Sequence, residues 1–220
     1  MFSANKIASA LLLLYTVSNG QVSRAGDVAR VDPLTKQVRN YQDTAYDFLT
    51  ALDDFTRTCG VPTGIDLEMP LKQRRLSVDV SRGTVIDVLN AIVAQEPSYK
   101  WVKVNGVINV MPEEHENSIL DLRIPHLQLA NADSSGVHAA IVSLPEVKEW
   151  LEQNHLTERT PNYMEIIVGK NRDVMPRVSL DLHDMTLREI LNRILKSCRF
   201  HSWVVARWGE KNQYLSIGVN

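Results

Sequence analysis

The sequence contains only two cysteines, Cys59 and Cys198, in 220 residues. At most one disulfide is therefore possible, and an oxidising compartment would permit it. Two buried free thiols are the equal alternative, and the residues alone do not decide between them. Neither cysteine has a second ligand residue at the spacing of a zinc site, so the sequence predicts no metal centre.

An excess of basic residues is also absent. The 24 lysines and arginines are outnumbered by 26 acidic residues, which gives a formal net charge of -2. Sequence-independent binding to nucleic acid needs a basic surface that displaces counterions, so we expect no nucleic-acid partner. The apolar fraction of 44% and the charged fraction of 23% are typical of a soluble protein with a packed core. The length allows one or two domains.

No apolar run is long enough to cross a membrane. The run at residues 7–17 falls short of the roughly 20 residues that a bilayer needs. Lys6 precedes it and small residues follow it, which is the pattern of a secretory signal. We therefore expect a signal peptide over residues 1–25, cleaved after Gly20 or Ala25. No cysteine follows for a lipid anchor, so the mature chain should be periplasmic or secreted, with no integral membrane segment.

Two parts of the sequence match each other at an offset of 102 residues, without a gap. Residues 75–104 align with residues 177–206, and most differences exchange one aliphatic side chain for another. Such a match indicates an internal repeat. The identical pairs include Thr84 and Thr186, Leu89 and Leu191, Asn90 and Asn192, and Trp101 and Trp203.

Each copy of the repeat has the pattern of a strand, a helix and a second pair of strands. Leu76, Val78 and Val80 alternate with polar residues, as in a strand with one buried face. Thr84 and Thr186 each precede an acidic residue by three positions, which predicts a capping box at a helix start. Apolar residues then recur at helical spacing, and two further strands follow in each copy. In the first copy, Asn105-Gly106 favours a tight hairpin turn.

A leading half precedes each of these segments. In the first copy, an apolar helical stripe over residues 45–55 is closed by Gly60, and residues 61–67 can return as a strand. In the second copy, residues 119–129 look extended and residues 134–143 look helical. Another helix begins at Pro145, and a strand is expected at residues 163–168. Each copy therefore predicts the order strand, helix, strand, strand, helix, strand, strand.

This order predicts an α+β fold made of two tandem small two-layer units, each a mixed β-sheet with helices on one face. The expected boundaries are residues 26–112 for the first unit and 119–220 for the second. The polar, aperiodic residues 113–118 form the expected linker.

The repeated unit resembles the short N-terminal domain of secretins and TonB-dependent receptors. The similarity is one of apolar spacing, and it spans residues 38–111 and 119–219. It implies domains that are periplasmic, bind other proteins and carry no catalytic residues. The segments that carry it are residues 76–80, 84–92 and 99–110, with their counterparts in 178–219.

Catalytic and ligand-binding patterns are missing. A carboxylate could orient the imidazole of His183, which lies between Asp181 and Asp184, but a polar turn between strand and helix is the better interpretation. The sequence has no Gly-x-Ser-x-Gly, no His-Glu-x-x-His and no glycine-rich phosphate loop. We predict no catalytic, cofactor-binding or metal-binding residues, and therefore no enzyme.

The tryptophans divide into two kinds. Trp101 and Trp203 occupy matching places after a buried helix, which favours the core over a ligand-stacking surface. Trp150 and Trp208 have no counterpart in the repeat, so we expect them at an exposed contact surface. The leading hypothesis is an exported protein-interaction module whose partner is another envelope protein. The alternatives are an envelope hydrolase that uses His183 and a carbohydrate-binding protein that uses its tryptophans.

Overall fold

The structure, a computed structural model, describes residues 32–68, 75–114, 117–159, 176–211 and 213–220. The expected signal peptide at residues 1–25 and the expected strand at residues 163–168 lie outside these ranges. Within them, we find no helix with the length and apolar character that a membrane crossing requires. The described residues belong to one compact unit, Asp32–Asn220.

The elements of the first copy follow the predicted order. In the second copy, residues 119–121 form a short helix instead of the expected extended segment, and a two-residue strand, Thr157–Glu158, was not predicted. The first copy comprises β1 (Gln37–Ala45), α1 (Phe48–Cys59), β2 (Thr63–Glu68), β3 (Leu76–Thr84), α2 (Val85–Val93), β4 (Tyr99–Val104) and β5 (Val107–Pro112), preceded by the short helix η1 (Pro33–Thr35). The second comprises η2 (Ile119–Asp121), β6 (Arg123–Ala132), α3 (Ser134–Ser143), α4 (Pro145–Gln153), β7 (Thr157–Glu158), β8 (Val178–Thr186), α6 (Leu187–Ser197), β9 (Ser202–Trp208) and β10 (Tyr214–Val219).

The local signals of the sequence act as expected. Thr84 and Asp87 form a capping box at the start of α2, and Thr186 and Glu189 form one at the start of α6. Gly60 ends α1 in the left-handed conformation, with φ of 67°. These contacts satisfy backbone groups that a helix terminus leaves without partners, so α2 and α6 begin and α1 ends where the sequence predicts. Ala45, which was expected in the first helix, is instead the last residue of β1, and α1 begins at Phe48.

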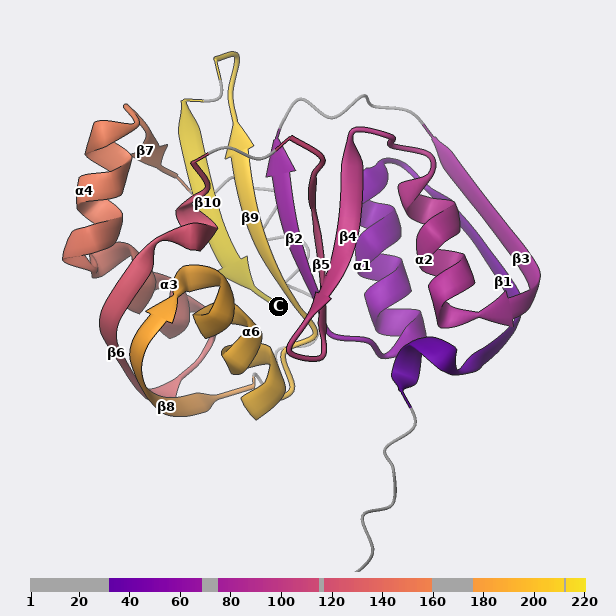
Figure 1. Ribbon diagram of the computed structural model, residues 1–220, viewed down its shortest axis with the longest axis horizontal. Coiled ribbons are helices and arrows are strands. Elements are labelled where there is room, and N and C mark those ends of the chain that lie inside the picture. Colours follow the sequence, from indigo (N-terminus) through magenta and orange to yellow (C-terminus); the bar gives the residue numbers. More distant parts are fainter. Residues whose placement is uncertain (1–31, 69–74, 115–116, 160–175, 212) are drawn as a thin grey trace, which may run out of the picture. The chain divides into compact units, whose positions relative to one another are not determined.

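One mixed sheet contains strands of both repeats. Its order is β4-β5-β2-β9-β10-β7, so that β2 of the first repeat and β9 of the second are neighbours (Figure 1). The β2–β9 pair is parallel and runs from Thr63 opposite Ser202 to Glu68 opposite Arg207. The α+β class is confirmed, and the sheet is continuous across the repeats. The predicted unit boundaries at residues 113–118 therefore separate the repeats in sequence but not in the sheet.

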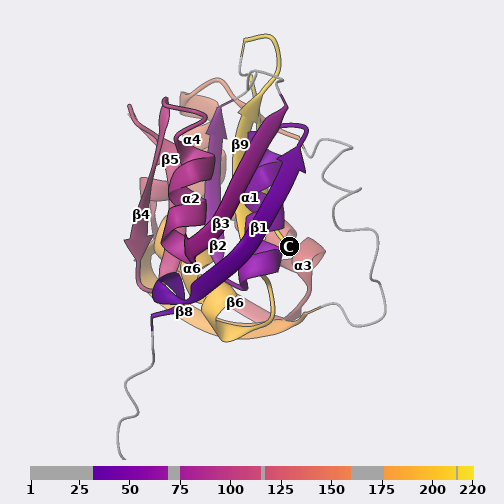
Figure 2. The same ribbon diagram turned by 90° about the vertical axis from the view of Figure 1, so that its right-hand side faces the viewer.

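Each repeat also forms a two-stranded antiparallel ribbon, β1–β3 in the first and β6–β8 in the second. The ribbon β1–β3 lies across α1 and α2 on the side away from the central sheet (Figure 2). Helices α3 and α6 contact the ribbon β6–β8 as well as the central strands β9 and β10. Each helix layer therefore has strands on both sides, which adds a layer to the two-layer unit that we expected.

The two repeats cover opposite faces of the central sheet. In β9, Val204 and Ala206 belong to the core of the first repeat, whereas Trp203 and Val205 belong to the core of the second. Because successive side chains of a strand point to opposite faces, the helices of the two repeats lie on opposite sides of β9.

The matched central leucines should carry much of the stability. Leu89 and Leu191 are both fully buried. Leu89→Ala or Leu191→Ala should each cost about 2–5 kcal/mol of unfolding free energy, because a cavity is left behind. His183→Ala, on an exposed side chain, should change it by about 0.5 kcal/mol or less. Denaturant melts measure all three variants, and a His183→Ala variant that was the least stable would contradict this expectation.

Candidate functional site

Strand β4 has a hydrogen-bonding edge that no described strand covers. It pairs with β5 on one side and is the outermost strand of the sheet. The backbone N–H of Ile108 in β5 donates to Pro62 O at 3.0 Å, so Ile108 and its cross-strand partner Lys103 form a non-hydrogen-bonded pair. The backbone groups of Lys103 therefore point away from β5, and by alternation so do those of Trp101.

The second repeat shows the same edge with a strand bound to it. Strand β9 is the repeat counterpart of β4, and its outer edge pairs with β2 in parallel. Trp203 lies opposite Gly64 in this pair. Any Cβ atom at position 64 would overlap the indole ring of Trp203. A glycine opposite the tryptophan is therefore what allows the two strands to approach.

A tryptophan–asparagine hydrogen bond marks this edge in both repeats. The Nε1–H of Trp203 donates to Asn192 Oδ1 at 2.8 Å, and that of Trp101 donates to Asn90 Oδ1 at 2.9 Å. Trp203 is fully buried in the core, as expected. Trp101 packs on the first core but is half-buried. The two sites share a geometry, and they differ in whether a strand lies against them.

Charge distinguishes the two edges. Lys100 and Lys103 of β4 stand where β9 has Ser202 and Val205. Lys103 is paired with Asp32, and its hydrogen bond holds the pKa of that carboxyl below its usual value. Lys100 in turn contacts Glu113, so both lysines of the β4 edge form ion pairs, whereas the β9 edge is apolar and buried. Lysines on an edge strand discourage pairing with apolar strands.

Trp150 and Trp208, the expected contact residues, are both half-buried. The guanidinium of Arg207 lies over the ring of Trp150 at 5.5 Å, and that of Arg159 lies over the ring of Trp208 at 5.6 Å. Trp208 also packs against Tyr214. Each indole therefore has a cation on one face, which leaves less of it for a ligand.

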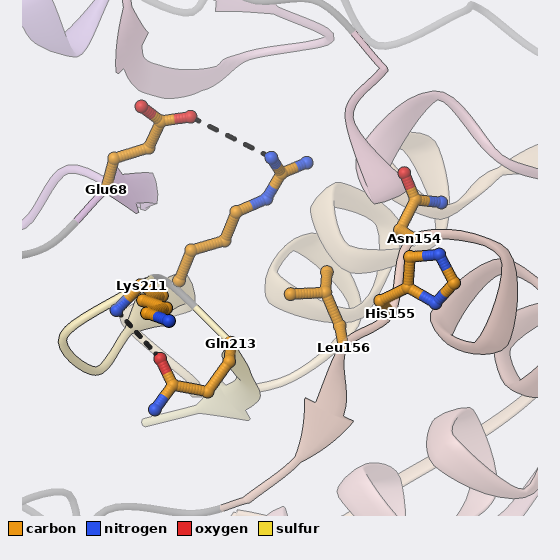
Figure 3. Close-up of a pocket in the computed structure, with 7 residues that line it drawn as sticks. Glu68, Asn154, His155, Leu156, Lys211 and Gln213 are labelled. Carbon is orange, nitrogen blue, oxygen red and sulfur yellow. Dashed lines mark hydrogen bonds and ion pairs between the residues drawn. The ribbon is translucent and has the colours of Figure 1, made fainter.

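A polar pocket of about 410 Å³ lies at the ends of β2 and β9 that carry Glu68 and Arg207. Glu68 faces Arg207 across it, and residues after α4 and in the β9–β10 loop complete the wall (Figure 3). Its charged lining residues are one carboxylate, Glu68, and two cations, Arg207 and Lys211. This lining does not contain the pair of carboxylates that acid–base catalysis often uses. The lining residues are Glu68, Asn154, His155, Leu156, Arg207, Lys211 and Gln213.

The cysteines are free thiols. Cys59 is buried at the end of α1 among the residues of the first core, whereas Cys198 packs against the second. The disulfide alternative is therefore not the one that the structure adopts. Burial raises the pKa of both thiols, which makes them poor nucleophiles.

His183 and Asp181 lie beside His126, a residue that the sequence did not single out. The three side chains form a cluster on the exposed face of the ribbon β6–β8. His126 and His183 are far apart in sequence, and only the pairing of β6 with β8 makes them neighbours. Knowledge of that register would have identified the cluster.

No known family model matches the chain, and comparisons with curated proteins and with solved structures find no similar protein.

Proposed function

We propose that this chain is an exported, non-catalytic protein-binding module of the cell envelope, and that the free edge of β4 takes an extended segment of another envelope protein. The doubled strand–helix order, which resembles the short N-terminal domain of secretins and TonB-dependent receptors, supports a binding role in the periplasm. The secretory pattern of the first 25 residues supports export.

The observation that carries this proposal is the parallel pairing of β9 with β2. The chain itself presents a strand bound to the repeat counterpart of the β4 edge, with Trp203 packed on Gly64. The equivalent edge of β4 has the same tryptophan–asparagine pair and outward-facing backbone groups. Addition of a strand to such an edge gains main-chain hydrogen bonds, and the flanking side chains give specificity.

The register of the internal pair specifies the chemistry of the partner segment. Trp203, Val204 and Val205 lie opposite Gly64, Ile65 and Asp66. A segment bound to β4 in the same register places a glycine beside Trp101 and an aliphatic residue beside Val102. Its third residue lies beside Lys103, where an acidic side chain can pair with the ammonium group in place of Asp32. We therefore infer an extended partner segment with the pattern glycine, aliphatic, acid.

The two alternative functions have weaker support. Stacking on a sugar ring needs an open aromatic face, and arginines cover one face of both Trp150 and Trp208. General acid–base catalysis by His183 needs a site that excludes water, but its side chain is 65% exposed. The sheet edge is therefore the better candidate for function.

A peptide of residues 61–68, the segment that pairs with β9, should bind the β4 edge of the intact protein. Lys103→Pro should weaken binding at least tenfold, because proline removes an outward-facing N–H that the bound strand needs. Lys103→Ala removes the charge but retains that N–H, so it should weaken binding clearly less than Lys103→Pro. Titration calorimetry measures the affinity, and NMR shift changes confined to β4 locate the site.

Two controls sharpen this test. The same peptide with valine in place of the glycine should fail to bind, because its side chain would meet Trp101. Circular dichroism must show that the Lys103→Pro variant is folded. Equal binding by the Pro and Ala variants, or shifts that fall elsewhere in the protein, would show that β4 is not the binding edge.

A further inference from the structure

The ribbon β6–β8 brings two histidines face to face. His126 and His183 are cross-strand partners, and their rings stack with centroids 4.5 Å apart and planes inclined by 9°. Leu127 and Leu182, the next pair along the ribbon, are buried in the second core. Because side chains alternate along a strand, both imidazoles project from the outer face of the ribbon.

Asp181 joins the two imidazoles. Its Oδ1 atom lies 2.8 Å from Nε2 of His126 and 3.1 Å from Nε2 of His183. Each of the three residues offers one ligand atom, and these atoms all lie within 4.8 Å of one another. The three side chains are between half and two-thirds exposed, so a solute can reach them and they can adjust their rotamers.

We propose that His126, Asp181 and His183 form a binding site for Zn²⁺. A tetrahedral zinc ion binds imidazole nitrogen and carboxylate oxygen at about 2.0–2.2 Å, which places neighbouring ligand atoms about 3.3 Å apart. The two nitrogen–oxygen separations are already close to this value. The two nitrogens lie within 4.8 Å of each other, and rotation of the exposed side chains can adjust this separation.

The donor set selects the kind of ion. Two imidazoles and one carboxylate suit zinc and similar transition metals, whereas calcium and magnesium prefer oxygen ligands alone. Gln128 lies opposite Asp181 on the same face, so its carbonyl or a water molecule can supply the fourth ligand. The neighbouring cation, Arg123, is paired with Asp184, which reduces its repulsion of a metal ion.

The first repeat supplies an internal comparison. Its ribbon keeps the cross-strand pair of glutamine and aspartate, Gln42 and Asp79, at the places of Gln128 and Asp181. At the place of His183 it has Ser81. The histidines are thus a feature of the second repeat alone, and they are not needed to form a ribbon of this kind. A role outside folding explains their presence better than packing does.

Calorimetric titration of the whole mature protein with Zn²⁺ alone tests the site. We expect one ion per chain, with an upward shift of the thermal midpoint, because a ligand that binds only the folded state stabilises it. His126→Ala, His183→Ala and Asp181→Asn should each weaken binding at least tenfold. His201→Ala, which removes an exposed histidine elsewhere, should leave the affinity unchanged.

A second measurement does not depend on affinity. Co²⁺ bound in place of Zn²⁺ should give the visible absorption of a tetrahedral ion, and His183→Ala should remove it. Equal zinc binding by the wild type and the His126→Ala variant would overturn the proposal, as would binding that His201→Ala abolishes. This outcome would leave the proposed strand-binding role of β4 untouched, because the two sites share no residue.

Discussion

Gly64→Ala should lower the free energy of unfolding by about 3 kcal/mol or more, at the upper end of the range for overpacked cores. The added methyl group would overlap the indole ring of Trp203, a fully buried side chain on the neighbouring strand. The ring cannot move aside easily, because its Nε1–H is hydrogen-bonded to Asn192. The clash would separate β2 from β9, the junction at which the repeats share one sheet. Denaturant melts provide the measurement.

A double-mutant cycle identifies the cause of this loss. Trp203→Ala alone should cost about 3–5 kcal/mol through the cavity it leaves. In the Gly64→Ala/Trp203→Ala variant the clash is absent, so the combined loss should be well below the sum of the two single losses. Trp101→Ala, which removes the half-buried repeat counterpart, should cost less than Trp203→Ala. Additive losses from the two positions would contradict the overlap.

Asp66→Asn should stabilise the protein at pH 8 and leave its stability nearly unchanged at pH 4. Asp66 is 5% exposed in β2, and burial raises its pKa from 3.8 to about 7, against the opposing influence of Arg188 and Arg207. Each pKa unit corresponds to 1.36 kcal/mol, so ionisation in the folded state costs on the order of 4 kcal/mol. Asparagine has nearly the same shape and carries no charge.

The direction of this effect follows from proton linkage. Well below pH 3.8 the carboxyl group is protonated in both states, and at pH 4, where only the unfolded chain is partly ionised, the substitution still changes the stability little. Between pH 4 and pH 7 the folded protein holds a proton that the unfolded chain releases, so the wild type loses stability as the pH rises. Urea melts at pH 4, 6 and 8 measure the difference, with Asp79→Asn as a control for the loss of one exposed carboxylate. A difference that shrank with rising pH would refute the raised pKa.

Local structure could be predicted from the sequence because its causes are local. The alternation at Leu76, Val78 and Val80 and the threonine caps determine a strand and a helix start within a few residues. The pairing of β2 with β9 depends instead on contacts between distant residues. The sequence did contain a signal for this pairing. Val204 and Val205 place apolar side chains on the two faces of β9, as in a strand that is buried on both sides, whereas β4 has Lys103 at the place of Val205.

The candidate sites were harder to predict for the same reason. The edge of β4 that no described strand covers is defined by which strands lie next to one another, and the cluster of His126, Asp181 and His183 is defined by the register of β6 against β8. That register shifts between Leu129 and Ala132, so counting residues from one strand to the other would not have given it. The sequence did not decide whether Cys59 and Cys198 form a disulfide. In the structure the two cysteines pack against separate cores and are free thiols.

The shared sheet affects the order in which the chain folds. Strand β2 is synthesised well before one of its two neighbours, β9, because Thr63 pairs with Ser202, which follows it by 139 positions. Contacts between residues so far apart in sequence form slowly, because a long loop must close first. Until then β2 exposes an unpaired edge next to Ile65 and Leu67, a state prone to aggregation. Pairing of β2 with β9 is therefore the step that removes this exposed edge.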